Sequence, residues 1–273
     1  MNILRGKIVI ITGASSGIGR STALAAARRG AKMVLGARNI EKLNVVADEC
    51  RQLNTEVIAV EVDVSNEQSC RNLIREAINH FGRIDVLINN AGISMRALFL
   101  ETDLSVLHKL MDTNFWGTVY CTKYALPYLL ESKGSLVGIS SIAGNKGLPA
   151  RTGYSASKFA MQGFLEVIRI EHLHEGLHVL IACPGFTASN IRTTALAADG
   201  SQQGESPRDE EKMMGSDEVA EHLLKAIEKR KRSLVLTLQG KLTIGLNKFF
   251  PSWVDRLVFN HMAKEPNSPF GKK

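Results

Sequence analysis

The sequence of 273 residues predicts one doubly wound α/β domain, with a seven-stranded parallel sheet, helices on both faces and an amphipathic C-terminal extension. Two observations predict this fold. Short runs rich in Val, Ile and Leu alternate with amphipathic stretches of helix length, which is typical of parallel β-α-β units. Several of these runs are apolar at every position, as in residues 8–11 and 86–88, which indicates strands buried on both faces.

The elements follow one another in near-strict alternation. We expect strands at residues 7–12, 32–36, 56–61, 84–88, 134–140, 177–182 and 234–238. We expect helices at residues 17–29, 40–53, 67–81, 105–131, 154–174 and 217–230. Residues 1–240 then form one domain and residues 241–273 form the extension. The polar, weakly periodic segment 193–214 is expected to be a surface loop, either a mobile lid or a tolerated insertion.

Composition narrows the class of protein. Hydrophobic residues make up 44% and charged residues 22% of the chain, as in ordinary globular domains, and no apolar run approaches the length of a membrane span. The four cysteines are dispersed, and His172, His174 and His178 do not share one helical face, so we expect no disulfide and no metal site. The net charge of +7 is spread along the chain, which argues against nucleic-acid binding. A cytoplasmic protein is expected.

The first strand runs into a glycine-rich turn that opens the first helix. Such a turn lets the backbone approach a diphosphate, while the helix N-terminus offers free N–H groups and a positive dipole end. The turn predicts a dinucleotide-binding loop of the Rossmann type. Its expected cofactor-binding residues are Gly13, Ser15, Ser16, Gly17, Ile18 and Gly19.

The ends of the second and third strands concern the choice of cofactor. No acidic residue stands at the end of the second strand to receive ribose hydroxyls, and Arg38 can instead pair with a 2′-phosphate, so NADP(H) is favoured. The alternative is that Arg38 only points to solvent. Asp63 and Val64 end the third strand, where a carboxylate can receive the adenine amino group, although Asp63 could instead cap the next helix.

Tyr154 and Lys158 stand four residues apart, which places them on one face of the predicted helix 154–174. A cation beside a phenol favours the phenolate and lowers the pKa of the phenol, as a proton donor and acceptor near neutral pH requires. Alone, such a pair is more often two ordinary surface residues. Further segments fit the catalytic interpretation: Asn89-Asn90-Ala91-Gly92, Asn114, Ser140-Ser141 and Pro184-Gly185.

In order, spacing and context these segments resemble the short-chain dehydrogenase/reductase family, from about residue 7 to residue 238. The resemblance implies that Tyr154 is the general acid or base and that Lys158 lowers its pKa and holds the nicotinamide ribose. It implies that Ser141 bonds the substrate oxygen and that Asn114 helps to hold a water in a proton relay. It further implies cofactor contacts by Asn90, Ala91, Gly92, Pro184, Gly185, Thr187 and Ser189.

The extension carries apolar residues at three- and four-residue steps, interrupted at Pro251, with Ser252 as an expected new helix cap. It could pack on the substrate cleft or a subunit interface, or residues 241–262 could lie on a membrane surface. Each alternative suits a lipophilic carbonyl or alcohol substrate. The chain also resembles the branch of hydroxysteroid dehydrogenases and acyl-dihydroxyacetone-phosphate reductases. The alternatives are a 3-oxoacyl-carrier-protein reductase and a non-catalytic NADP(H)-binding sensor. The family resemblance implies a homodimer or homotetramer formed through two long helices.

Overall fold

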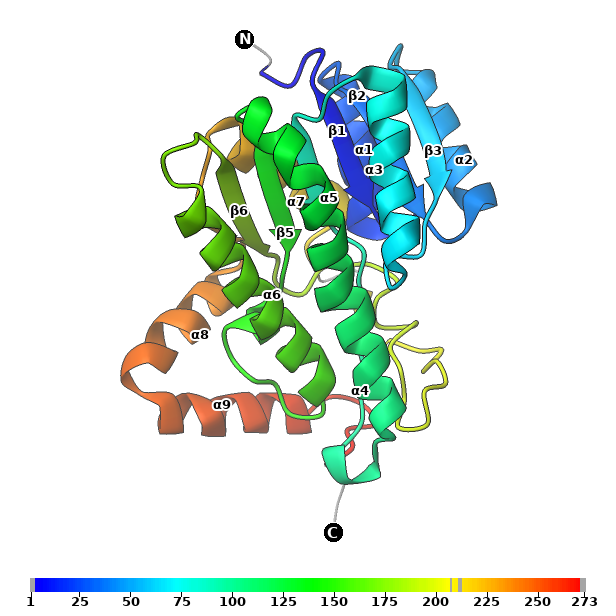
Figure 1. The fold of residues 1–273 in the computed structure, drawn as a ribbon. Helices are drawn as coiled ribbons and strands as arrows, with labels where there is room; N and C mark the ends of the chain where they lie inside the picture. The colour runs from blue at the N-terminus through cyan, green and yellow to red at the C-terminus, as the bar shows by residue number, and fades with distance from the viewer. Residues whose placement is uncertain (1–2, 207, 211–212, 271–273) are drawn as a thin grey trace.

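One parallel sheet organises the protein, as the computed structural model of residues 3–206, 208–210 and 213–270 shows (Figure 1). Its seven strands lie in the order β3-β2-β1-β4-β5-β6-β7, which confirms the predicted doubly wound sheet. The strands are β1 (Ile8–Thr12), β2 (Lys32–Ala37), β3 (Val57–Glu61), β4 (Val86–Asn89), β5 (Ser135–Ile139), β6 (His178–Cys183) and β7 (Ser233–Val235). Because the strand order reverses between β1 and β4, a crevice opens beyond the carboxyl ends of these two strands.

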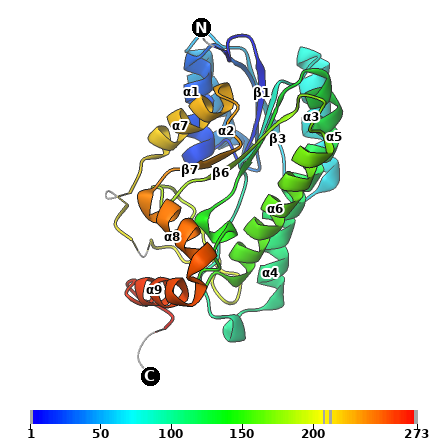
Figure 2. The same ribbon diagram turned by 90° about the vertical axis from the view of Figure 1, so that its left-hand side faces the viewer.

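Helices cover both faces of the sheet (Figure 2). One face carries α1 (Gly17–Arg28), α2 (Ile40–Arg51) and α7 (Ser216–Glu228). The other face carries α3 (Glu67–Phe81), α5 (Gly117–Glu131) and α6 (Thr152–Glu171). The predicted bounds of most of these elements differ from the observed ones by only a few residues.

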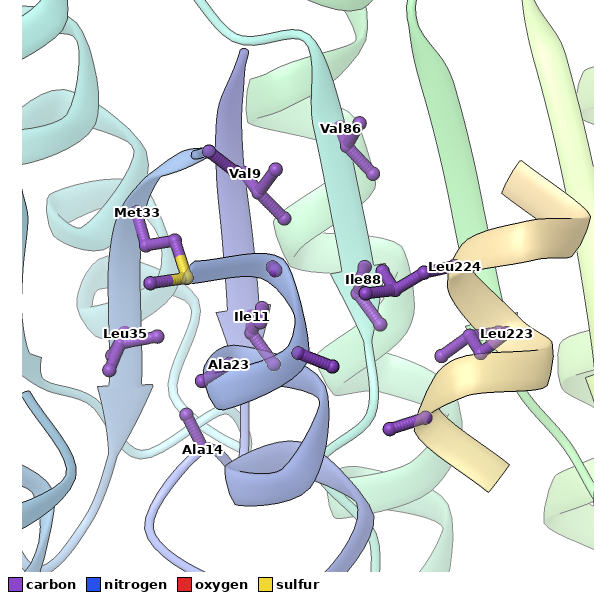
Figure 3. Packing of buried hydrophobic residues seen from close by; sticks show 14 of the residues in the cluster. Val9, Ile11, Ala14, Ala23, Met33, Leu35, Val86, Ile88, Leu223 and Leu224 are labelled. Atoms are coloured by element: carbon purple, nitrogen blue, oxygen red, sulfur yellow. The ribbon is translucent and has the colours of Figure 1, made fainter. Parts of the chain in front are cut away.

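The core on the α1 side is built from aliphatic side chains that leave water completely or almost completely. Val9 and Ile11 of β1 and Leu35 of β2 are 0% exposed, and they share one hydrophobic cluster with Ala23 of α1 and Leu223 of α7 (Figure 3). Small side chains on α1 let this helix lie close to the sheet. Each fully buried Val, Leu or Ile stabilises the fold by roughly 2 kcal/mol relative to an exposed one.

The long helix expected at residues 105–131 has three parts. They are α4 (Leu104–Leu110), a π-helical segment at Met111–Trp116, labelled η2, and α5. A π-helical turn holds one residue more than an α-helical turn, and such turns occur frequently at functional sites. Asn114 lies inside this segment and is 0% exposed.

The last strand ends earlier than predicted, because a helix begins at residue 238. The Thr237 hydroxyl accepts a hydrogen bond of 3.1 Å from the Gly240 N–H, which caps α8 (Leu238–Phe249). Helix α8 therefore crosses the boundary expected at residue 240. After it, α9 (Pro251–Ala263) begins with Pro251 in its first turn and Phe250 as N-cap, so the expected cap at Ser252 is wrong.

The extension packs beyond the carboxyl ends of β5 and β6, below α6 in Figure 1. The Lys146 ammonium, which follows β5, donates to Asn247 of α8 at 2.7 Å and also pairs with Asp255 of α9. Val254 and Met262 of α9 are 2% and 4% exposed. One cation thus joins both helices of the extension to the body of the domain.

The segment expected to be a lid is tied to its surroundings in several places. Thr187 pairs with Met214, and Leu196 pairs with both Met95 and Gln202, as isolated β-bridges. Residues 207, 211 and 212 of this segment lie outside the described residues. The choice between a lid and an insertion stays open.

Cys50, Cys70, Cys121 and Cys183 are free and buried. His178 is held by Ser135 at 2.9 Å and by the Lys231 carbonyl at 2.9 Å. Within the part of the chain that the structure describes, no cluster of three or more His, Cys, Asp or Glu side chains is placed to hold a metal. No helix among the described residues is both long and apolar enough to cross a bilayer.

Candidate active site

The glycine-rich turn between β1 and α1 leaves backbone groups open at the base of the crevice. Gly13 and Gly17 have φ angles of +66° and +51°, which non-glycine residues rarely adopt. A Cβ at Gly19 would lie 2.2 Å from the Gly13 carbonyl oxygen, so only glycine permits this close packing. Ser16 is the N-cap of α1 and its side chain makes no capping bond, which leaves the positive helix end for an anion.

Asn90 fastens this turn to the end of β4. Its side-chain amide donates to the carbonyl oxygens of Thr12 at 2.9 Å and Gly13 at 3.2 Å. In return, the Thr12 hydroxyl accepts from the backbone N–H groups of Asn90 and Ala91, both at 3.1 Å. The two strands on either side of the crevice are therefore locked together where the sequence predicts cofactor contacts.

A cleft of about 810 Å³ runs from this turn to the start of α6. Of the residues predicted for the site, those that line the cleft are Gly13, Ser15, Ser16, Gly17, Ile18, Arg38, Asp63, Val64, Asn90, Ala91, Gly92, Ser141, Tyr154, Lys158, Pro184, Gly185, Thr187 and Ser189. Gly19 and Asn114 lie behind the lining. The structure thus brings together side chains from seven separate segments of the chain.

Tyr154 and Ser141 meet at the inner part of the cleft. Tyr154 is in the first turn of α6, and Ser141 is the N-cap of the short helix η3 (Ile142–Gly144) after β5. Burial raises the pKa of the Tyr154 phenol, and the hydrogen bond with the Ser141 hydroxyl only partly opposes this rise. The phenol is therefore held in its protonated form at neutral pH.

Lys158 lies one turn further along α6 and is 3% exposed. Its ammonium donates to the Ile139 carbonyl at 2.8 Å and sits 5.9 Å from the centre of the Tyr154 ring. Burial lowers the pKa of Lys158 to about 8. The sequence prediction that this cation brings the Tyr154 pKa towards neutrality differs from the structure, because burial raises the pKa of the phenol and the nearby cations that oppose the rise are Arg151 and Arg192.

Asn114 acts here through the backbone of a neighbouring loop. Its side-chain oxygen accepts from the Ile93 N–H at 2.8 Å, and its amide donates to the Ile93 carbonyl and to the Ser157 hydroxyl, both at 2.9 Å. These bonds use both amide hydrogens and one of the two acceptor positions of the side-chain oxygen. The Asn114 main-chain carbonyl accepts a further hydrogen bond from the Thr118 hydroxyl at 2.9 Å, and the part of Asn114 in a proton relay stays a prediction.

Arg38 lies at the outer end of the cleft, exposed, beside Asn39 and Lys42. Asp63 accepts two hydrogen bonds from Ser65, at 3.0 Å from its N–H and 2.7 Å from its hydroxyl. The N-cap of α3 is Asn66, so capping does not require Asp63. Both side chains remain accessible to a bound molecule.

Sequence reasoning missed the residues at the other end of the cleft. Arg151, Phe186, Arg208, Met262 and Glu265 line this end. They come from loops and from the extension, where no periodic pattern or local motif marks a site. The excess of basic residues was the one available signal, and it does not say which of them converge.

Comparisons with known proteins find relatives over most of the chain. The family described as short chain dehydrogenase matches residues 7–199. An "11-beta-hydroxysteroid dehydrogenase-like 2" of Arabidopsis thaliana is 44% identical over 69% of this chain, a match that spans 61% of that protein's length. An "11-beta-hydroxysteroid dehydrogenase A" of Sesamum indicum is 36% identical over 98% of this chain and 80% of its own.

Two solved structures resemble the whole domain. An alcohol dehydrogenase of the archaeon Thermococcus sibiricus, complexed with 5-hydroxy-NADP, has a TM-score of 0.76 at 26% identity and covers 85% of this chain and 96% of its own. A short-chain dehydrogenase/reductase of Burkholderia phymatum in complex with NAD has a TM-score of 0.82 at 24% identity, over 92% and 95% of the two chains. The second likeness concerns the fold alone.

Proposed function

Because this chain belongs to the short-chain dehydrogenase family, we propose that it transfers hydride between NADP(H) and a ketone or secondary alcohol on a fairly apolar substrate. The observation that carries the proposal is the convergence of Tyr154, Ser141 and Lys158 on the cleft that contains the glycine-rich turn. A proton donor, a second hydroxyl and a cation then lie along one path from the predicted cofactor site to the start of α6.

The residues present fit a dinucleotide. The glycine-rich turn offers a close approach of backbone and a free helix end for the diphosphate, as the positive φ angles of Gly13 and Gly17 support. Arg38 and Lys42 provide two cations at the outer end for a 2′-phosphate, and Ala37 at the end of β2 offers no carboxylate to repel it. When bound, the nicotinamide would supply or accept the hydride.

The protein's own groups would handle the proton and the developing charge. Reduction places negative charge on the carbonyl oxygen, and the preplaced hydroxyls of Tyr154 and Ser141 would stabilise it where it forms. Burial keeps Tyr154 protonated at neutral pH, which is the form that gives a proton to that oxygen. Lys158 would orient the nicotinamide ribose from inside the cleft. The proposed physiological direction is therefore reduction, in a cytoplasmic setting rich in NADPH.

Replacing Tyr154 by Phe tests this assignment. The variant keeps the ring that packs in the cleft and loses only the hydroxyl, so NADPH affinity should persist while kcat/KM falls by on the order of a hundredfold or more. Cofactor binding is measured by fluorescence titration, and turnover by oxidation of NADPH. Retention of wild-type turnover would refute the role of Tyr154 as the acid.

A panel of ketones separates the remaining alternatives. The panel would hold ketosteroids, 3-oxoacyl thioesters, acylated keto-phosphates and small diketones. Strong preference for carrier-bound 3-oxoacyl thioesters would favour a 3-oxoacyl-carrier-protein reductase. NADPH binding without turnover of any member would favour the non-catalytic sensor.

A further inference from the structure

Three arginines surround one carboxylate at the end of the cleft furthest from the glycine-rich turn. Arg208 bonds the Glu265 carboxylate at 2.5 Å and 2.9 Å through two nitrogens. Arg96 and Arg151 each approach the other carboxylate oxygen at 3.7 Å. All four side chains are at least four-fifths buried, with exposed fractions of 8% for Arg96, 12% for Arg151, 18% for Arg208 and 6% for Glu265.

This cluster lies against the reactive groups. Arg151 is the N-cap residue of α6 and directly precedes the turn that holds Tyr154. Arg208 stacks on the Phe186 ring at 3.6 Å, just beyond the carboxyl end of β6. Arg151, Arg208 and Glu265 line the same cleft as Tyr154, while Arg96 stands behind them.

The four side chains of the cluster, three arginines and one glutamate, together carry a net positive charge. Among the described residues, Glu265 is the one carboxylate within ion-pair distance of these three guanidinium groups, which leaves an excess of positive charge. Burial lowers the pKa of Arg151 to about 10, since Glu265 only partly offsets the loss of water. The buried Nε of Arg96 has no hydrogen-bond partner. Buried cations without full compensation destabilise a fold, so their presence calls for a further anion.

We propose that Arg151 and Arg208, supported by Arg96, form a subsite for an oxyanion of the substrate, a carboxylate or a phosphate carried at a distance from the ketone. The Glu265 carboxylate fills part of this subsite, in the position that the carboxylate or phosphate of the substrate would take. The apolar side chains of Phe186 and Met262 beside it suit a hydrocarbon body. The substrate class is thus an amphipathic keto acid or keto-phosphate, an inference that rests on the proposed function.

A simpler account makes Glu265 an anchor that holds the C-terminal segment on the domain. Arg96 does donate to the Pro266 carbonyl at 2.7 Å, which suits that account. The anchor alone, however, gives no role to the opening of Arg151 and Arg208 towards the cleft. The two accounts differ in what happens when Glu265 loses its charge.

The experiment uses methyl ketones of increasing chain length that end in a carboxylate, a phosphate or, as the neutral match, a primary amide. Binding to the NADPH-loaded Tyr154→Phe protein is measured by calorimetry, and kcat/KM is measured with the wild type. We expect the charged ketones to exceed the amides by about tenfold or more in both measurements, because a site built for a charged group rejects its neutral analogue. A preference for the carboxylate or for the phosphate then shows which of these two groups the subsite binds.

Variants separate the subsite from the anchor. Arg151→Met should lower the ratio of kcat/KM for charged over neutral ketones by about tenfold, and Glu265→Gln should raise it by removing the internal competitor. Arg75→Met, an exposed arginine of α3, is the matched control and should leave the ratio unchanged. If Glu265→Gln lowers the melting temperature and leaves the ratio unchanged, the anchor account holds and the subsite is refuted.

The two proposals fail in different ways. Equal binding of charged and neutral ketones, altered alike by Arg151→Met, overturns the subsite while turnover of either ketone upholds the proposed function. Selective binding of the charged ketones without any turnover by the wild type upholds the subsite and overturns the reductase.

Discussion

Burial of the Lys158 ammonium makes the stability of the fold depend on pH. An ammonium with 3% exposure and one carbonyl partner has given up most of its hydration, which is why its pKa falls to about 8. An exposed lysine of the unfolded chain titrates near ~10.4. Between these two values the unfolded state holds more protons than the folded state, so folding stability rises with pH in this window.

This difference in pKa predicts a pH-dependent effect of Lys158→Met. Relative to this variant, the wild type should gain on the order of 2 kcal/mol of unfolding free energy as the pH rises from about 7 to about 10. Urea unfolding at several pH values measures the gain. Lys123→Met, on the exposed face of α5, is the control and should follow the wild type. A pH-independent difference would mean that Lys158 is hydrated in the folded protein.

The proposed part of Arg38 in the choice of cofactor belongs to the same scale. Arg38→Ala should weaken NADPH binding by about tenfold or more and leave NADH binding nearly unchanged, because only NADPH carries the 2′-phosphate. Fluorescence titration with both cofactors measures the change. Arg20→Ala, on the neighbouring helix α1 and paired with Glu49, serves as the control. An equal loss for both cofactors would contradict the assignment.

At the residue scale, the sequence predicts the types and the spacing of the site side chains. It does not predict how much water the fold removes around them. The interval between Tyr154 and Lys158 is a property of helical geometry, so it can be read without coordinates. The sign of the Tyr154 pKa shift depends on how much water the folded chain removes around the phenol. That quantity belongs to the packed cleft and to no local pattern.

At the scale of elements, the C-terminal extension is distinguished by large apolar side chains that it exposes on its surface. Phe249, Phe250 and Trp253, where α8 meets α9, are 77%, 59% and 53% exposed, and Lys241 and Lys248 stand exposed nearby. Apolar side chains beside cations suit the surface of a membrane that carries anionic lipids. We propose a peripheral membrane contact at this corner, next to the cleft that Met262 and Glu265 line.

Vesicle sedimentation tests the contact. The wild type should bind vesicles that contain anionic lipid, and replacing Phe249, Phe250 and Trp253 by Ser should weaken the binding by roughly tenfold or more, since each buried aromatic contributes a few kcal/mol. Leu100→Ser removes an equally apolar side chain, 97% exposed in η1 (Phe99–Glu101), and is the matched control. Equal binding by wild type and triple variant would refute the contact.

The regular helices and strands could be predicted from the sequence, but the irregular segments that interrupt or end them could not. The strands and helices follow from apolar runs and amphipathic spacing. The π-helical turn at Met111–Trp116 has no such pattern, because it depends on how Asn114 reaches the loop at Ile93. The early end of β7 depends on one cap at Thr237, which competes with a strand pattern that continues past it.

At the scale of the whole molecule, α6 and the segments next to α5 and α6 expose several large apolar side chains. Trp116, Phe159, Val167, Ile170 and Leu173 on or next to these helices are 42–65% exposed. A patch of this kind marks an interaction site more often than a free surface. We propose that it joins copies of the chain into a dimer or tetramer.

Light scattering after size-exclusion chromatography tests the assembly. The wild type should have the mass of a dimer or tetramer, and Val167→Glu should shift it towards the monomer, because a charge in the middle of an apolar interface is costly to bury. Val45→Glu, at an exposed position of α2, is the matched control. A monomeric wild type would overturn the proposal.

At this scale the sequence could not predict which residues from distant parts of the chain come together in space. Arg96 and Glu265 stand far apart in the chain and share one ion-pair cluster only because the extension folds back over the cleft. The connections between parallel strands, by contrast, are limited by a general rule on the handedness of crossovers. Rules of topology constrain the sheet and leave the path of the final segment free.

The π-helical turn also sets the directions in which the side chains of the following helix α5 point around the helix axis. Each residue of a helix advances the side chains by about 100° around the axis. The extra residue within Met111–Trp116 lets Asn114 face the loop at Ile93 while Cys121, Ala125 and Leu129 still face the sheet. A version of the chain shortened by one residue in this turn could keep one of these orientations and not both, so the length of the segment is as constrained as its composition.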